Sequence, residues 1–199
     1  MFDTFGDNDG TAVNSPLFGA DYGKYLHGAD FVRASSQRID LPLIHALATD
    51  FTWSLWLRRP AVASGAYTVM ALTRNSSFNP YYWLSGTDQN NVLVTRSDTA
   101  SDLQSITAAY TTNQWHHIAV THQADTRLVQ MYQDGQFVGS HTRVAAITVD
   151  RLTIGARRAP AVDNHLQGQI DEVAIFNRVL SSNEVSEIYN NGKGRFYTP

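Results

Sequence analysis

The chain has 199 residues, of which 43% are hydrophobic and 11% aromatic, so it is long enough for one substantial core and too short for two. Its formal net charge is −3 and its fifteen Lys and Arg residues are scattered, which argues against a nucleic-acid partner. No apolar run approaches the ~18 residues of a membrane span. The absence of cysteine excludes disulfides and thiolate chemistry.

The first 21 residues are rich in Asp, Gly, Asn and Ser and show no sustained apolar period, so residues 1–21 are predicted to form an N-terminal arm outside the domain. They do not resemble a secretory signal peptide, because the start of the chain carries acidic charge and lacks an apolar segment. Phe2, Phe5, Leu17 and Phe18 are too widely spaced for a strand or a helix stripe. We therefore expect the arm to be mobile in the free protein and to become ordered only against a partner.

From Tyr22 onward, short apolar runs alternate with turn clusters, a pattern typical of an all-β sandwich. Residues 51–58 alternate with a period of two, and Asp134-Gly135 is the strongest hairpin signal in the chain. Trp53 and Trp115 are assigned to the sandwich core. Further strands are predicted at residues 67–72, 81–84, 92–95, 118–121, 128–132, 137–140 and 152–154.

The C-terminal part of the chain reads as a strand followed by one short helix. The strand is predicted from a β-branched and aromatic run that starts after Gly168. The helix is predicted to begin after Ser181 as its N-cap, with Glu184 completing a capping box, and to end at Gly192. Residues 193–199 then form a C-terminal tail.

Four sequence motifs carry a resemblance to a known family. Residues 168–184, with Gly-x-Ile-Asp-Glu-Val followed by Phe-Asn-Arg-x-Leu-Ser-x-x-Glu, resemble the closing motif of laminin-G-like domains in the concanavalin A-like lectin and glucanase group. Residues 31–41, residues 51–57 and the Trp115 stretch with its downstream Tyr-x-Asp-Gly agree with it. The resemblance covers residues 22–192 and implies a two-sheet antiparallel jelly roll with one short C-terminal helix.

Asp171 and Glu172 interrupt the closing strand, and a buried carboxylate needs a cation, a hydrogen-bond donor or solvent. In related jelly rolls the acidic residue of this strand supplies oxygens to a calcium ion. By resemblance, the partner segment here would be Gly28 to Asp30 or the N-terminal arm, and Ca2+ is the one cofactor implied. Two alternatives are that Asp171 pairs with an arginine such as Arg33 or Arg38, or that it caps a loop.

Sugar binding requires an exposed aromatic platform beside polar side chains. Tyr81, Tyr82 and Trp83, flanked by Asn79 and Asp88, form the densest such stretch and are the predicted ligand-binding residues. The alternative is that this aromatic triplet packs in the core and at a sheet edge.

Catalysis is not expected. Retaining glycosidases of this fold use two carboxylates about 5 Å apart. The chain contains only three glutamates, Glu172, Glu184 and Glu187, and lacks the family's Glu-x-Asp-x-Glu strand. His116 and His117 are neighbours in a predicted strand, so their side chains point to opposite faces and cannot bind one metal ion together.

The sequence therefore predicts a non-catalytic surface-binding or structural module. Modules that resemble this one occur in bacteriophage structural proteins as capsid decorations or tail adhesins. The resemblance implies a virion-surface protein, oligomeric or assembly-bound, whose partners are capsid or tail proteins and cell-surface glycans. The alternatives are a free carbohydrate-binding lectin and, less in keeping with the glutamate content, a glycoside hydrolase.

Overall fold

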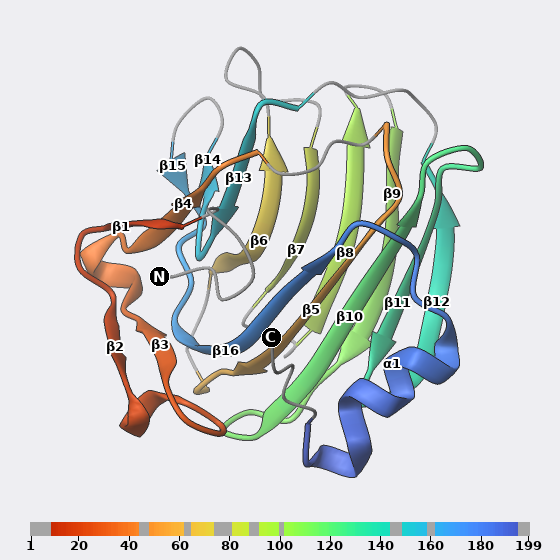
Figure 1. The fold of residues 1–199 in the computed structure, drawn as a ribbon. Coiled ribbons are helices and arrows are strands. Elements are labelled where there is room, and N and C mark those ends of the chain that lie inside the picture. Colours follow the sequence, from red (N-terminus) through yellow and green to blue (C-terminus); the bar gives the residue numbers. More distant parts are fainter. Residues whose placement is uncertain are drawn as a thin grey trace.

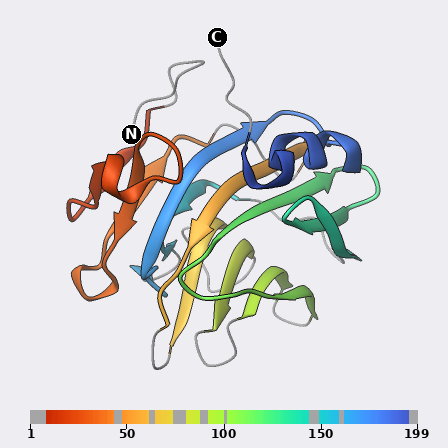
Figure 2. The same ribbon diagram turned by 90° about the horizontal axis from the view of Figure 1, so that it is seen from below.

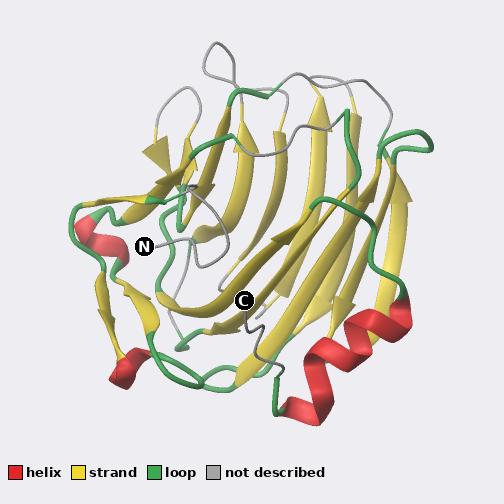
Figure 3. Cartoon of the chain, in the orientation of Figure 1, coloured by secondary structure: helices red, strands yellow, loops and turns green. Residues whose placement is uncertain are grey.

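The computed structural model describes residues 9–43, 48–61, 65–73, 81–87, 92–99, 102–143, 149–158 and 162–194. Within these ranges the chain forms two seven-stranded antiparallel sheets. The sheets pack face to face, as Figure 1 and Figure 3 show. The all-β jelly roll with one short C-terminal helix is thereby confirmed. The one described α-helix has eight residues, and no described helix is long and apolar enough to cross a membrane.

The strands are grouped here by sheet, in their spatial order. Sheet 1 contains β1 (Thr11–Val13), β4 (Arg38–Leu41), β13 (Arg151–Ile154), β6 (Ala66–Thr73), β7 (Tyr81–Thr87), β8 (Val92–Thr99) and β9 (Asp102–Ala109). Sheet 2 contains β12 (Gln136–Thr142), β11 (Leu128–Gln133), β10 (Trp115–Gln123), β5 (Phe51–Arg58), β16 (Gly168–Phe176), β3 (Gly28–Phe31) and β2 (Leu17–Gly19). A small hairpin is formed by β14 (Arg157–Arg158) and β15 (Val162–Asp163).

The core lies between the two sheets and follows from side-chain alternation. In β5, Trp53, Leu55 and Leu57 point inward and are fully buried against residues of sheet 1. The assignment of Trp53 to the core is confirmed. The assignment of Trp115 is wrong, because Trp115 is partly exposed and lies directly opposite Arg58 on the outer side of the sheet.

Helix α1 (Ser182–Tyr189) lies against the outer face of sheet 2, as seen from below in Figure 2. Its N-terminus has the predicted capping box, in which the Ser181 N–H donates to Glu184 Oε2 at 2.8 Å and the Glu184 N–H donates to Ser181 Oγ at 3.3 Å. The helix ends at Asn190, which adopts the left-handed conformation, rather than at Gly192. The Gly194 N–H donates back to the Tyr189 carbonyl, so the predicted tail begins packed on the helix end.

The interpretation of residues 1–21 as an arm outside the domain is wrong for the described part of that segment. Strand β1 pairs with β4 at the edge of sheet 1, and β2 pairs with β3 at the edge of sheet 2. Asn14 and Ser15, both in the left-handed conformation, lead the chain from one sheet to the other. An edge strand of three residues needs only a backbone ladder on one side, and this explains why it lacks the apolar period of an inner strand. Residues 1–8 lie outside the described part.

Candidate functional site

The outer face of sheet 2 divides into rows of side chains that run across the strands. Along β5, Ser54, Trp56 and Arg58 point outward in turn, because their neighbours in sequence point into the core. Trp56 is only 2% exposed, whereas Arg58 is exposed. The part of this face that is buried under other segments of the chain therefore ends between Trp56 and Arg58.

The covered row consists of Asp171, Trp56 and His117, which are directly opposed in β16, β5 and β10. Lys24 Nζ lies 4.1 Å from the centroid of the Trp56 ring, and the Tyr189 ring packs on Trp56 at 5.8 Å between centroids. The loop that carries Lys24 and the end of α1 thus close this row against ligand.

The next row is open and polar. Asp30 of β3 lies opposite Gln169 of β16, and Gln169 lies opposite Arg58 of β5. Directly opposed residues share a face of the sheet, so these three side chains stand side by side although they are far apart in sequence. Arg58 Nη1 and Gln169 Oε1 are 3.5 Å apart. We refer to Asp30, Gln169 and Arg58 as the open row.

A pocket of about 180 Å³ opens at this row, lined by Asp30, Arg58, Pro60, Asn113 and residues 167–169. It is smaller than the ~300–1,000 Å³ of sites that enclose a drug-sized ligand, so it admits part of a ligand and leaves the rest on the surface. Gly168 has a φ of +148°, and a Cβ atom there would lie 2.6 Å from the Arg58 carbonyl oxygen. Glycine at this position lets β16 run close to the end of β5.

The inner wall of the pocket is held by a buried arginine. Arg59 is 1% exposed, and its guanidinium carbon lies 3.4 Å from the centroid of the Tyr67 ring. Arg59 Nη1 donates to the Tyr110 hydroxyl at 2.8 Å, and Nε donates to the Gln167 carbonyl at 3.0 Å. The Asn113 N–H donates to the Arg59 carbonyl at 2.7 Å. These bonds place two lining residues of the pocket, Gln167 and Asn113, on one rigid support.

The pocket offers both hydrogen-bond donors and acceptors. Arg58 presents a guanidinium fork, and the side-chain amides of Gln169 and Asn113 can both donate and accept. Burial raises the pKa of Asp30 above its usual value, and a hydrogen bond from Gln169 acts in the opposite direction. Asp30 is the single carboxylate among the lining residues, whereas glycoside hydrolysis requires a pair.

Asp171 caps a loop, which is one of the alternatives that the sequence left open. It is 4% exposed, and its Oδ2 accepts the N–H groups of Lys24 at 2.7 Å and Tyr25 at 3.0 Å. Its Oδ1 accepts the N–H of Glu172 at 2.8 Å, at a bulge where Glu172 has a φ of 49°. The bulge interrupts the ladder and explains how two acidic residues are accommodated in the closing strand.

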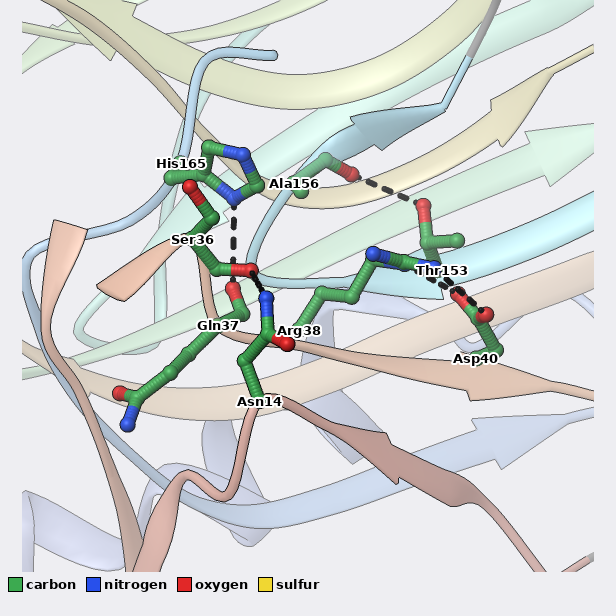
Figure 4. A network of polar contacts seen from close by, with 8 residues as sticks. All are labelled: Asn14, Ser36, Gln37, Arg38, Asp40, Thr153, Ala156 and His165. Carbon is green, nitrogen blue, oxygen red and sulfur yellow. Dashed lines mark hydrogen bonds and ion pairs between the residues drawn. The ribbon is translucent and has the colours of Figure 1, made fainter. Parts of the chain in front are cut away.

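Neither arginine proposed for Asp171 is its partner. Arg38 makes a bidentate ion pair with Asp40 on its own strand, as Figure 4 shows. Arg38 Nε lies 2.9 Å from Asp40 Oδ1. Arg33 Nε donates to the His165 carbonyl at 2.9 Å. The arginine pairing is therefore wrong, because backbone N–H groups of the adjacent loop occupy the carboxylate instead.

The observed contacts of Asp171 account for its buried carboxylate without a calcium ion. Calcium requires six to eight oxygen ligands, whereas the groups that contact the Asp171 carboxylate are N–H donors. Asp30 belongs to the open row, and Gly28 lies two residues before it in the same strand, β3. Among the described residues, no group of three or more His, Asp or Glu side chains could hold a metal ion. A Ca2+ ion bound by Asp171, Asp30 and Gly28 stays a prediction.

The predicted aromatic platform cannot be compared with the pocket. Tyr81, Tyr82 and Trp83 begin β7, where their backbones pair with β8. Their side chains lie outside the described part of the chain, and so do Asn79 and Asp88. These five residues stay a prediction.

Sequence reasoning named Asp30 for a different role and missed Arg58, Gln169 and Asn113. One signal was available for Arg58, because the alternation of residues 51–58 places it on the face opposite the core residues. No local signal joins it to Gln169 or Asn113, which come from distant segments.

The two histidines lie on opposite faces, as predicted. His116 Nδ1 and Asp134 Oδ2 are 2.7 Å apart, and this contact is the main cause that raises the pKa of His116. His117 Nε2 and Ser54 Oγ are 2.9 Å apart on the outer face, where burial lowers the pKa of His117 to about 4.

Several solved structures share this fold at low sequence identity. The botulinum neurotoxin serotype G binding domain is 16% identical, with a TM-score of 0.71, and the match covers 94% of this chain and 47% of that chain. The chain thus spans about half the length of that domain. Domain 4 of AbnA, an extracellular GH43 arabinanase from Geobacillus stearothermophilus solved with arabinotriose, is 20% identical, with a TM-score of 0.73 and coverage of 93% and 90%.

A third similar structure is the CBM40 of the Ruminococcus gnavus IT-sialidase bound to alpha2,3 sialyllactose. It is 14% identical, with a TM-score of 0.60, and the match covers 71% of this chain and 83% of that chain. No curated protein matches the chain by sequence. The family model of the concanavalin A-like lectin/glucanases superfamily matches residues 33–186. The chain therefore belongs to the concanavalin A-like lectin/glucanase superfamily.

Proposed function

We propose that this protein is a non-catalytic binding module whose ligand is a carbohydrate held at the open row of sheet 2. The observation that carries the proposal is the arrangement of Asp30, Gln169 and Arg58 in register across three strands, around a pocket with a single carboxylate. These side chains offer acceptors, donors and an amide that supplies both, all on one face.

A sugar matches this chemistry because each of its hydroxyl groups both donates and accepts. Adjacent hydroxyls on a ring suit the paired donors of a guanidinium or the paired oxygens of a carboxylate. The buried support under the pocket, in which Arg59 holds Gln167 and Asn113, keeps part of the wall in place before the ligand arrives. Such preorganisation lowers the entropy cost of binding.

Two of the similar structures support a carbohydrate ligand, since they are described with arabinotriose and with sialyllactose. Binding rather than hydrolysis is supported by the pocket itself, because Asp30 has no second carboxylate beside it among the lining residues. The hydrolase alternative has no comparable observation in its favour.

A role at the surface of a bacteriophage virion, as a capsid decoration or tail adhesin, stays a prediction that rests on family resemblance. Carbohydrate binding at the open row is compatible with it and with a free lectin. Co-sedimentation of the protein with a purified phage particle, lost when the particle is dissociated, would support the virion role. Recovery only as a free species from the native source would favour the lectin.

The proposed function is tested by a glycan array followed by calorimetric titration of the sugars that bind. Arg58→Ala and Gln169→Ala should each weaken binding about tenfold or more, which corresponds to about 1.4 kcal/mol. Gln136→Ala is a matched control, because Gln136 is exposed on β12 at the other edge of the same sheet. Undiminished binding by both open-row variants, or release of reducing sugar by the wild-type protein, would contradict the proposal.

A further inference from the structure

The open row continues beyond the pocket on both sides. Trp115 of β10 lies directly opposite Arg58, and Leu17 of β2 lies directly opposite Asp30. The full row therefore reads Leu17, Asp30, Gln169, Arg58 and Trp115, with one residue from each of five adjacent strands. At about 4.8 Å between neighbouring strands, its four steps extend over roughly 19 Å.

The composition of this extended row changes along its length. Its centre is polar, and its two ends are a partly exposed indole and an aliphatic side chain that is 49% exposed. Trp115 is not a lining residue of the pocket, but it lies directly opposite the lining residue Arg58 and two residues after the lining residue Asn113 in the chain. Trp115 points outward beside the buried part of this face. It differs from Trp56 in the neighbouring row, because Lys24 and Tyr189 pack on the Trp56 ring.

We infer that the site takes a linear oligosaccharide that lies across the strands of sheet 2, with Trp115 as a stacking platform for a second sugar ring. This inference rests on the proposed function. The pocket of about 180 Å³ holds one part of the ligand, and a ring next to it meets the indole beyond Arg58. Sugar rings have apolar C–H faces as well as hydroxyl edges, so they pack on an aromatic face while neighbouring units hydrogen-bond.

The two ends of the row have different roles. Trp115 offers a broad rigid face, whereas Leu17 offers a small apolar contact on a three-residue edge strand. Trp115 is therefore the residue that determines the preference for chain length, and Leu17 contributes less. The inference predicts that affinity grows with chain length until the row is filled.

The experiment uses arabino-, xylo-, gluco- and galacto-oligosaccharides, each as one, three and five units, in calorimetric titrations of the full chain. For the sugar series that binds, the trimer or pentamer should bind at least tenfold more tightly than the monomer. Trp115→Ala should abolish this gain while leaving the affinity for the monomer within twofold of the wild type. Trp115→Phe should retain most of the gain, because it keeps an aromatic face.

Phe137→Ala is the matched control, because Phe137 is an exposed aromatic residue on β12 at the far edge of the same sheet. Thermal melting of each variant checks that it folds. Equal affinity for monomer and pentamer, or an unchanged length dependence in Trp115→Ala, would overturn the inference and leave the proposed function intact. Failure of every sugar on both the panel and the array would overturn the two together.

Discussion

The covered row and the open row are neighbours on one face of one sheet, and they differ in what lies above them. Asp171, Trp56 and His117 are closed by the loop around Lys24 and by the end of α1. The open row shares β16 and β5 with the covered row, at positions two residues away, takes its third residue, Asp30, from β3, and lines an open pocket. Strand register thus supplies equivalent rows, and a loop and a helix decide which row stabilises the fold and which is available to a ligand.

The largest effect is expected for removal of the carboxylate that holds the covering loop. Asp171→Ala leaves the N–H groups of Lys24 and Tyr25 without their acceptor, and hydrogen bonds to a charged group contribute about 1.5–3 kcal/mol each. We expect the free energy of unfolding to fall by about 3 kcal/mol, measured by urea denaturation. Asp125→Ala, in an exposed turn, should change it by less than about 0.5 kcal/mol.

The same residue separates loop capping from calcium binding. If Asp171 acts through the observed N–H contacts, EDTA leaves the melting temperature of the wild-type protein unchanged while Asp171→Ala lowers it. A melting temperature that falls in EDTA and is restored by added calcium would instead establish the predicted ion.

A smaller loss is expected at the glycine that lets the open row form. Gly168→Ala places a Cβ atom against the Arg58 carbonyl in a backbone region that suits glycine, at a cost of about 2 kcal/mol. Gly19→Ala is the control, because its Cβ would meet Tyr22 at an ordinary 3.7 Å. Chemical denaturation of both variants tests this, and equal stability of the two would show that the approach at Gly168 is not constrained.

The covered row should also make stability depend on pH. Burial lowers the pKa of His117 to about 4, so between its ordinary value of 6.5 and about 4 the unfolded chain binds a proton that the folded protein does not. This contribution is complete above pH 6.5 and is lost as the pH falls, by at most about 1.4 kcal/mol per pH unit. His117→Gln, which keeps a hydrogen-bonding group near Ser54, should flatten the dependence.

Urea midpoints measured between pH 4.5 and 7.5 test this expectation for the wild type and the variant. His116 contributes with the opposite sign, because its pKa is raised by Asp134, but it is present in both proteins. Parallel curves for the two proteins would show that His117 does not carry the effect.

The smallest effect on stability is expected in the open row, where the effect on binding is largest. Arg58 is exposed and its one described side-chain contact is the 3.5 Å approach to Gln169, so Arg58→Ala should change the free energy of unfolding by less than about 0.5 kcal/mol. A loss comparable to that of Asp171→Ala would remove the distinction between the two rows. It would show that Arg58 stabilises the fold.

Local chemistry explains which elements could be predicted. The capping box of α1 involves residues three positions apart, and the hairpin at Asp134-Gly135 has positive φ at both turn residues. Most of the inner strands were predicted because burial on one face leaves an alternating pattern. Strands β1 to β4 were not predicted, since each has only three or four residues, and β9 was not, since it has few large apolar residues.

The amino-acid sequence accounts for the two-sheet fold, its closing strand and helix, and the need of Asp171 for a partner, because each depends on periodicity or on groups close together in the chain. The tertiary structure was needed to show that Asp171 holds a loop, that Trp115 faces outward, and that Asp30, Gln169 and Arg58 meet. Strand register explains this division. The alternating pattern of a strand says which of its side chains face outward, but a shift of two residues in the pairing of β3, β16 or β5 would keep every core face buried and bring different side chains together, so the pattern of each strand does not say which residues meet.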